Sequence, residues 1–180
     1  MGVIPPLYEQ SMGMVGHTYP LIGMAVNHHR TIRGTPMSFK TRPFQIEMYV
    51  DFPKLDGADV VKGVQTGQSE MFIIFAIYEA GWTGRIVVYV LPTDGLRDRF
   101  VDTRINPLLL TVPAYRARLP GVEAAELAKG DTGSLKRKRL GPGLLLFNGA
   151  KTDANFIELT ADTFIVDEYD TSILVGAHSN

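Results

Sequence analysis

Residues 62–70 read KGVQTGQSE and run directly into an apolar stretch. A phosphate-binding loop has the form G-x-x-x-x-G-K-[ST], opens a helix, and holds phosphates with its backbone N–H groups and its lysine. Gly67 and Ser69 match this form, but Gln68 occupies the lysine position and Lys62 stands at the first glycine. Because lysine carries a point charge on a flexible stem, Lys62 can reach the same oxygens from the other end of the loop. We therefore predict an anion site at a helix N-terminus, the alternative being a glycine turn without a ligand.

The segments around this loop predict an α/β domain with a mainly parallel sheet. Residues 71–78 are apolar on every face, which favours a helix buried against a sheet and closed by Gly81. RIVVYVL, residues 85–91, is a continuous run typical of a parallel strand covered on both sides. We also expect a brief buried strand at residues 59–61 and a buried strand within residues 163–170. Ligands of such sheets bind at the carboxyl ends of the strands.

The remaining segments predict shorter elements around an irregular N-terminal arm, residues 1–40, and a core domain, residues 41–180. After Pro92-Thr93-Asp94 we expect an amphipathic surface helix with Leu96, Phe100 and Ile105 on one face and Arg97, Asp98 and Asp102 on the other. We further expect a helix in residues 42–52 that ends before Pro53, a helix around residues 122–129, and a hairpin about residues 141–143.

Composition limits the classes of protein that fit. With 180 residues, 45% hydrophobic and 21% charged, the chain suits one globular domain. The net charge of −1 argues against a uniformly basic nucleic-acid coat, and the absence of cysteine excludes disulfides, thiolate metal sites and cysteine nucleophiles. No apolar run approaches the roughly 18 residues of a membrane helix, and the N-terminus lacks a signal-peptide pattern. We expect a soluble, unsecreted protein without a membrane partner.

The strand signal TFIVDEYD carries Asp167 and Glu168 to its end. Hydrolysis of ATP needs a carboxylate that holds Mg²⁺ and a second group that orients or deprotonates the attacking water. Adjacent residues of a strand point to opposite faces, so the two acids can have different tasks. We predict Asp167 as the metal residue and Glu168 as the catalytic base. The alternative is an exposed strand end with ordinary solvated acids.

Several segments together resemble the ATPase domain of phage large terminase subunits, the motors that package viral DNA into procapsids. The resemblance covers about residues 35–170, and its more specific part is the segment YVLPTDGLRDRFVDTRINPLL between the two nucleotide motifs. The other matching stretches are RPFQ (42–45), KGVQTGQSE (62–70), LLLFNGA (144–150) and TFIVDEYD (163–170). The resemblance implies a P-loop NTPase fold of the RecA-like (ASCE) class.

The same resemblance implies roles for individual residues. Gln45 would contact adenine, Ser69 would ligate Mg²⁺, and Asp167 with Glu168 would form the Walker B pair. The nucleotide-binding loop would comprise Lys62, Gly63, Val64, Gln65, Thr66, Gly67, Gln68, Ser69 and Glu70. The implied cofactors are ATP and Mg²⁺. The implied partners are double-stranded DNA, a portal protein, a small terminase subunit and further copies of the chain in a ring, all in the host cytoplasm.

The sequence departs from this family pattern in its arginines. Many large terminases carry an arginine where this chain has Gln65, and others carry one where it has Ile157-Glu158. The candidates for a charge-stabilising arginine elsewhere are Arg99, Arg104, Arg137 and Arg139. A coupling motif and a nuclease domain are expected beyond residue 180, so we expect a fragment of a longer protein. The rival interpretations are a helicase-like DNA translocase and a nucleotide-binding fragment without turnover.

Three other features have ordinary structural explanations. His28-His29 lacks acidic or histidine partners at ligand spacing, so we expect loop residues in preference to a metal site. The basic run at residues 136–139 is expected to be the solvated edge of the hairpin, with contact to DNA phosphate as the alternative. Trp82 is expected to be a packing residue rather than a platform on which a base stacks.

Overall fold

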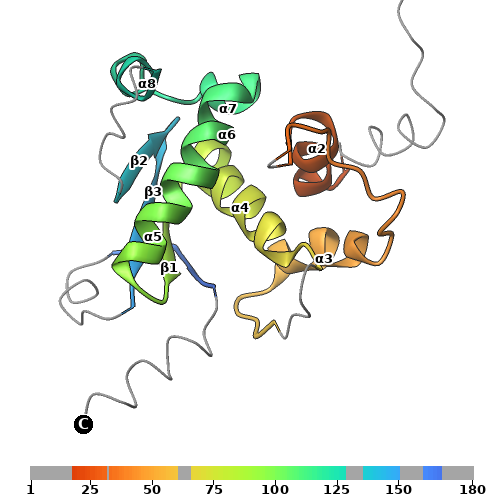
Figure 1. Ribbon diagram of the computed structural model, residues 1–180. Coiled ribbons are helices and arrows are strands. Elements are labelled where there is room, and N and C mark those ends of the chain that lie inside the picture. Colours follow the sequence, from red (N-terminus) through yellow and green to blue (C-terminus); the bar gives the residue numbers. More distant parts are fainter. Residues whose placement is uncertain (1–17, 32, 61–65, 129–135, 151–159, 168–180) are drawn as a thin grey trace, which may run out of the picture. The chain divides into compact units, whose positions relative to one another are not determined.

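The computed structural model describes residues 18–31, 33–60, 66–128, 136–150 and 160–167 (Figure 1). The chain divides into two compact units, Met1–Phe75 and Ala76–Asn180. The boundary falls inside helix α4, Gln68–Tyr78. Five predicted site residues lie outside the described residues, namely Lys62, Gly63, Val64, Gln65 and Glu168.

The first unit contains helices α2 (Pro20–Asn27) and α3 (Gln45–Asp51) and the first turns of α4. Helix α2 starts with Pro20, whose fixed φ and missing N–H suit the first helical position. The prediction of an irregular arm is therefore wrong for α2. The signal was weak because the run PLIGMAVN is apolar almost throughout, and its mostly buried residues leave no polar face to mark a helical period.

Helix α3 lies within the predicted segment, residues 42–52, and brings aromatic rings into the core of this unit. Tyr49 is buried with its ring centroid 4.9 Å from that of Phe39. Phe52 begins a 3-10 turn, Phe52–Lys54, and lies 5.1 Å from Phe75 of α4. Helix α3 ends at Asp51, before Pro53 as predicted, and the chain continues through Pro53 in the 3-10 turn, since proline is tolerated in the first turn of a helical segment.

The predicted strand at residues 59–61 is wrong where the structure describes it. Asp59 and Val60 are exposed and take no part in the described sheet. Val61 lies outside the described residues. An apolar pair is too short a signal to specify a strand, because a strand needs partners that the local sequence does not supply.

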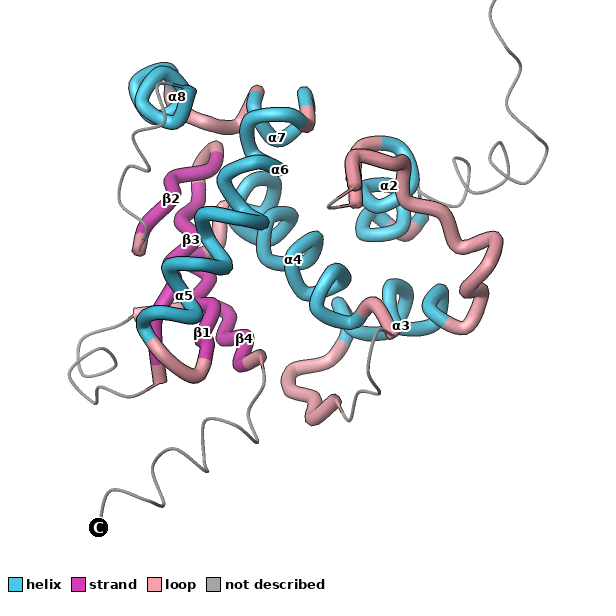
Figure 2. Tube along the Cα trace, in the orientation of Figure 1, coloured by secondary structure: helices cyan, strands magenta, loops and turns pink. Residues whose placement is uncertain are grey.

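The second unit contains a four-stranded sheet in the order β2-β3-β1-β4 (Figure 2). Its strands are β1 (Ile86–Leu91), β2 (Arg137–Leu140), β3 (Gly143–Gly149) and β4 (Thr163–Val166). Strand β1 pairs in parallel with both β3 and β4, and β2 pairs antiparallel with β3 in the predicted hairpin. The mainly parallel α/β sheet predicted from the sequence is confirmed.

The central strand of the sheet is more deeply buried than the outer strand β4. The central strand β1 is buried over Val87–Leu91, as its continuous apolar run predicts. Strand β4 ends the described sheet, and only Ile165 of its four residues is buried. The predicted buried strand is therefore wrong for Phe164 and Val166, whose side chains are about half exposed.

Four described helices follow strand β1 in this unit, which gives a sheet with helices as the α/β prediction requires. They are α5 (Asp94–Phe100), α6 (Asn106–Thr111), α7 (Pro113–Arg116) and α8 (Gly121–Ala128), with a π-helical turn at Val101–Ile105. Helix α5 packs on β1 and β3 (Figure 1). Trp82 is half-buried and packs against other side chains as expected, with its ring centroid 6.3 Å from that of Tyr115.

Two details of the helix predictions are wrong. Helix α4 does not close at Gly81 but continues in a π-helical turn, Glu79–Thr83, and ends at Gly84 with φ 80°. The inward face of α5 is also different, because Arg97 is buried and Leu96 is exposed. Ion pairs within the helix let Arg97 turn inward, a possibility that apolar periodicity does not record.

Candidate functional site

The end of the predicted phosphate loop is a tight turn that opens α4. Gly67 has φ 86°, a left-handed conformation that L side chains rarely adopt, and its backbone oxygen accepts the first α4 bond from the Met71 N–H. A Cβ at this position would collide with the side chain of Gln45 and would lie 3.8 Å from Nη1 of Arg42. The first N–H groups of a helix have no partner within it and attract anions. Both the positive φ and the close approach of Gln45 therefore require glycine at the start of α4.

Gln45 connects α3 to this turn. Its side chain is 1% exposed, and its Nε2 donates a hydrogen bond to the backbone oxygen of Thr66. Gln68, which occupies the usual lysine position, is buried as well. Among the described residues, none donates a hydrogen bond to Oε1 of Gln45 or of Gln68. Buried polar atoms without a partner are uncommon in folded proteins, so these two amide oxygens suit a ligand or water with N–H or O–H donors.

A second link joins the N-terminal segment to the first turn of α4. Nε2 of His29 lies 2.6 Å from Oε1 of Glu70, with the histidine fully buried and the carboxylate 14% exposed. The backbone oxygen of His29 also accepts a hydrogen bond from Met37. Sequence reasoning treated His29 as a loop residue, which missed this contact because 41 residues separate the two partners.

A cavity of about 370 Å³ opens beside α3 in the same unit. Its lining is mainly apolar and includes three carboxylates. The lining residues are Glu47, Met48, Asp51, Phe52, Leu55, Ala58, Asp59, Val60 and Met71. Such a lining suits a flat, uncharged group with amino donors and disfavours phosphate, because like charges repel at short range.

In the second unit, the parallel strands β1, β3 and β4 end at one edge of the sheet, the edge at which α/β proteins bind ligands. Asp167 follows β4 at this edge and is 4% exposed. Its N–H donates to the backbone oxygen of Val90 at 3.0 Å, and its Oδ2 accepts a 2.8 Å hydrogen bond from the hydroxyl of Tyr89. The predicted metal residue is therefore held in a defined position and is not an ordinary solvated acid.

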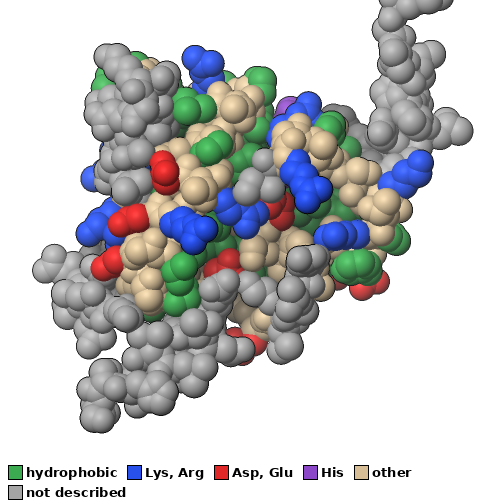
Figure 3. Space-filling view, in the orientation of Figure 1, with side chains coloured by type: hydrophobic (Ala, Val, Ile, Leu, Met, Phe, Trp, Pro, Cys, Tyr) green, Lys and Arg blue, Asp and Glu red, His purple; other side chains and the backbone are tan. Residues whose placement is uncertain are grey.

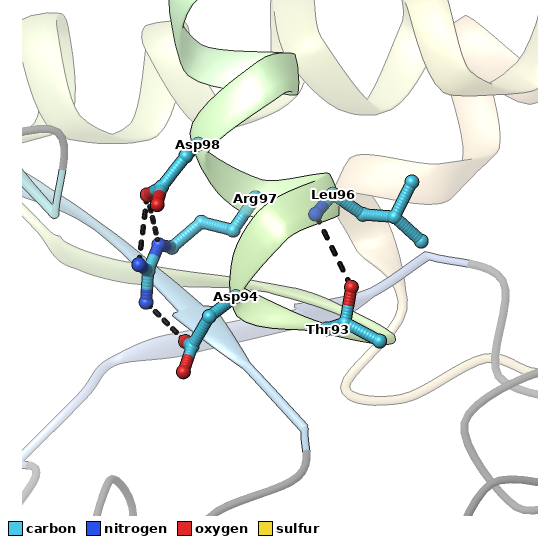
Figure 4. Close-up of polar contacts among 5 residues, drawn as sticks. All are labelled: Thr93, Asp94, Leu96, Arg97 and Asp98. Atoms are coloured by element: carbon cyan, nitrogen blue, oxygen red, sulfur yellow. Dashed lines mark hydrogen bonds and ion pairs between the residues drawn. The ribbon is translucent and has the colours of Figure 1, made fainter.

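The N-terminus of α5 lies at the same edge, after β1 (Figure 4). The Thr93 hydroxyl accepts the Leu96 N–H at 3.2 Å, as expected of an N-cap. Nε and Nη2 of Arg97 donate to Oδ1 of Asp98 at 2.8 and 2.7 Å, and Nη1 donates to Asp94. Asp94 in turn lies against the end of β3, since a Cβ on Gly149 would be 2.6 Å from its Oδ1. Sequence reasoning placed Arg97 on the outer face and missed this cluster.

A family model for the ATPase domain of the phage terminase large subunit gpA matches residues 33–174. The chain belongs to this family. Its membership confirms the predicted resemblance to large terminases and, with the mainly parallel sheet, the P-loop NTPase-like α/β fold. The family implies nucleotide binding, a role in ATP hydrolysis, and DNA and the packaging machinery as partners. Searches of curated proteins and of solved structures found no match for this chain.

The oxygen donors of the terminase domain fit Mg²⁺ chemically. A hydroxyl at Ser69 and a carboxylate at Asp167 are hard ligands of the kind that Mg²⁺ prefers. In the described ranges no group of three or more His, Asp or Glu residues could hold a metal ion, which includes the region of His28 and His29. Mg²⁺ is usually held by one or two protein ligands together with water and substrate phosphates.

The described part of the terminase domain leaves the arginine candidates open. Arg104 lies over the ring of Phe100 at 5.9 Å, whereas Arg99, Arg137 and Arg139 are exposed. Basic and acidic side chains are interspersed on the face drawn in Figure 3. No helix in the described ranges is both long and apolar enough to cross a membrane.

Proposed function

We propose that this chain hydrolyses ATP in a Mg²⁺-dependent reaction and that the hydrolysis powers packaging of double-stranded DNA into procapsids. The observation that carries the proposal is the match of residues 33–174 to the terminase ATPase domain. The family match favours a packaging motor over a helicase-like translocase.

The proposed nucleotide-binding residues are Gln45 and the loop from Lys62 to Glu70. The left-handed turn at Gly67 and the start of α4 support phosphate binding, because helix N-terminal amides favour anions. The buried Gln45 amide supports a role in adenine recognition, since amides pair with the donor and acceptor edge of a base.

The proposed hydrolytic residues have two roles, which are binding of Mg²⁺ and activation of the attacking water. Ser69 and Asp167 are the proposed ligands of Mg²⁺, which when bound neutralises charge on the transferred phosphoryl group. Glu168 orients the attacking water in line with the γ-phosphate and accepts its proton. Lys62 supplies the positive charge that Gln68 cannot provide.

The proposed cellular setting follows the terminase family. The chain works in the host cytoplasm as part of a homo-oligomeric ring, together with a portal protein and a small terminase subunit. Residues 41–180 form the ATPase core. The stabilising arginine is one of Arg99, Arg104, Arg137 and Arg139.

The test is ATP turnover by the full chain with and without Mg²⁺ and double-stranded DNA, together with nucleotide binding. Lys62→Ala is expected to weaken ATP binding about tenfold or more, and its matched control is Lys40→Ala at an exposed lysine of the same unit. Glu168→Gln is expected to bind ATP normally and to lose about 10²–10⁴ in turnover, as removal of a general base does. Its control is Asp102→Asn at an exposed carboxylate. Unchanged binding by Lys62→Ala would refute the relocated lysine.

A second candidate function is nucleotide binding without turnover. Gln65 and Gln68 favour it, because they replace an arginine and a lysine that stabilise charge in the transition state. Tight binding of Mg²⁺ and ATP without hydrolysis, even with DNA present, would support this candidate over the ATPase.

A further inference from the structure

Tyr89 makes a contact with Asp167 that sequence reasoning did not anticipate. Its hydroxyl donates to Oδ2 of Asp167 at 2.8 Å, and both side chains are buried. The partners are 78 residues apart in the chain and meet because β1 and β4 are parallel neighbours. The contact lies at the carboxyl edge of the sheet.

The position of the phenol is fixed by its own surroundings. Tyr89 pairs with Ile165 in the β1–β4 register, so its side chain and that of Asp167, two residues further on, emerge on the same face. Its ring stacks on Phe100 of α5 with centroids 5.1 Å apart and lies 6.0 Å from Phe147 of β3. Packing on two elements therefore holds the hydroxyl where it meets the carboxylate.

The chemical nature of the donor matters for a metal ligand. A phenol donates a neutral hydrogen bond, so it orients the carboxylate without cancelling its charge. A cation bound at Asp167 would meet no competing positive charge from Tyr89. Groups that orient metal ligands from behind typically affect metal affinity by about 10–100-fold.

We infer that Tyr89 is a positioning residue for Asp167: its hydroxyl holds the carboxylate in one orientation toward the Mg²⁺ that accompanies bound nucleotide. The inference rests on the proposed function, in which Asp167 is a metal ligand. Tyr89 itself does not touch the nucleotide or the metal in this role. It acts by limiting rotation of the Asp167 side chain, so that less ordering is needed when the metal binds.

The test compares Tyr89→Phe with Tyr115→Phe in the full chain. Tyr115 is also fully buried in the second unit, so its variant controls for the loss of a buried hydroxyl. Binding of Mn²⁺ in the presence of a non-hydrolysable ATP analogue is measured by electron paramagnetic resonance, and binding of the analogue alone is measured in EDTA. Thermal unfolding without metal measures separately whether either substitution destabilises the fold.

Tyr89→Phe is expected to weaken Mn²⁺ binding about tenfold and to leave analogue binding in EDTA unchanged, whereas Tyr115→Phe changes neither. Saturating Mg²⁺ is expected to restore turnover. In an Asp167→Asn background, Tyr89→Phe is expected to have no further effect on Mn²⁺ affinity. Replacement by p-aminophenylalanine, which keeps the ring and a neutral N–H donor, is expected to recover most of the affinity.

Two results would overturn the inference in distinguishable ways. If the unaltered chain binds Mn²⁺ with nucleotide and Tyr89→Phe binds it equally well, the positioning role is refuted while the proposed ATPase stands. If the unaltered chain binds no Mn²⁺ with the analogue, the proposed metal site itself fails and the role of Tyr89 fails with it.

Discussion

Replacing His29 by leucine is expected to destabilise the unit that carries the phosphate loop by about 2 kcal/mol. Hydrogen bonds to charged groups contribute about 1.5–3 kcal/mol. His29 is fully buried, but Glu70 is 14% exposed and can regain part of its hydration when the partner is lost. That exposure places the expected loss in the lower half of the range. Leucine fills most of the vacated volume, so the cavity contribution is small.

The assay is a double-mutant cycle of His29→Leu and Glu70→Gln, with unfolding in urea followed by circular dichroism. The coupling energy is expected to be about 1.5 kcal/mol, because the two residues share one contact of 2.6 Å. His28→Leu, at the exposed neighbour, is the control and should change stability by less than about 0.5 kcal/mol. A coupling energy below about 0.5 kcal/mol would show that this contact does not hold the N-terminal segment to α4.

Three further predictions concern the turn, the arginine cluster and a tyrosine. Gly67→Ala is expected to cost more than about 1 kcal/mol in thermal unfolding and to abolish nucleotide binding, because φ is positive and a Cβ would collide with Gln45; wild-type binding would contradict this. Arg97→Met is expected to lower the free energy of unfolding by about 1 kcal/mol, because the guanidinium is buried but the two carboxylates that it pairs with are about half exposed and regain hydration, and an unchanged or higher free energy of unfolding would refute it. Burial raises the pKa of Tyr78, and the negative charge of Glu79 raises it further. The protonated phenol therefore stabilises the folded state fully below about pH 10, and this stabilisation is lost as pH rises through the folded-state pKa. Denaturation curves from pH 8 to about pH 11 should therefore show a smaller alkaline loss of stability for Tyr78→Phe than for the wild type, and equal losses would contradict the shift.

The sequence allowed several elements of the site to be predicted because their signals are local. The left-handed turn at Gly67 follows from a glycine before a helix, and the cap at Thr93 follows from a hydroxyl after a strand. The family resemblance read from the motifs is confirmed by the match over residues 33–174. The roles of Lys62 and Glu168 remain predictions, and both residues lie outside the described part of the chain.

Contacts that join distant segments could not be predicted in this way. Gln45 reaches the backbone of Thr66, and His29 reaches Glu70, although no spacing rule connects either pair. The burial of Arg97 could not be predicted either, because it depends on two carboxylates that neutralise its charge within α5. Hydrophobic periodicity treats every charge as outward-facing and therefore misses such pairs.

The sequence by itself determined the class of this protein: a continuous β-branched run made β1 a central parallel strand, and the GPG turn made the β2–β3 hairpin. These features depend on backbone preferences and on the side chains of neighbouring residues. Only the tertiary structure decided that Tyr89 meets Asp167, because that contact requires the register of two strands that are 78 residues apart at this point. Strand register depends on the packing of whole elements, so the immediate environment of the proposed metal ligand was decided by the fold.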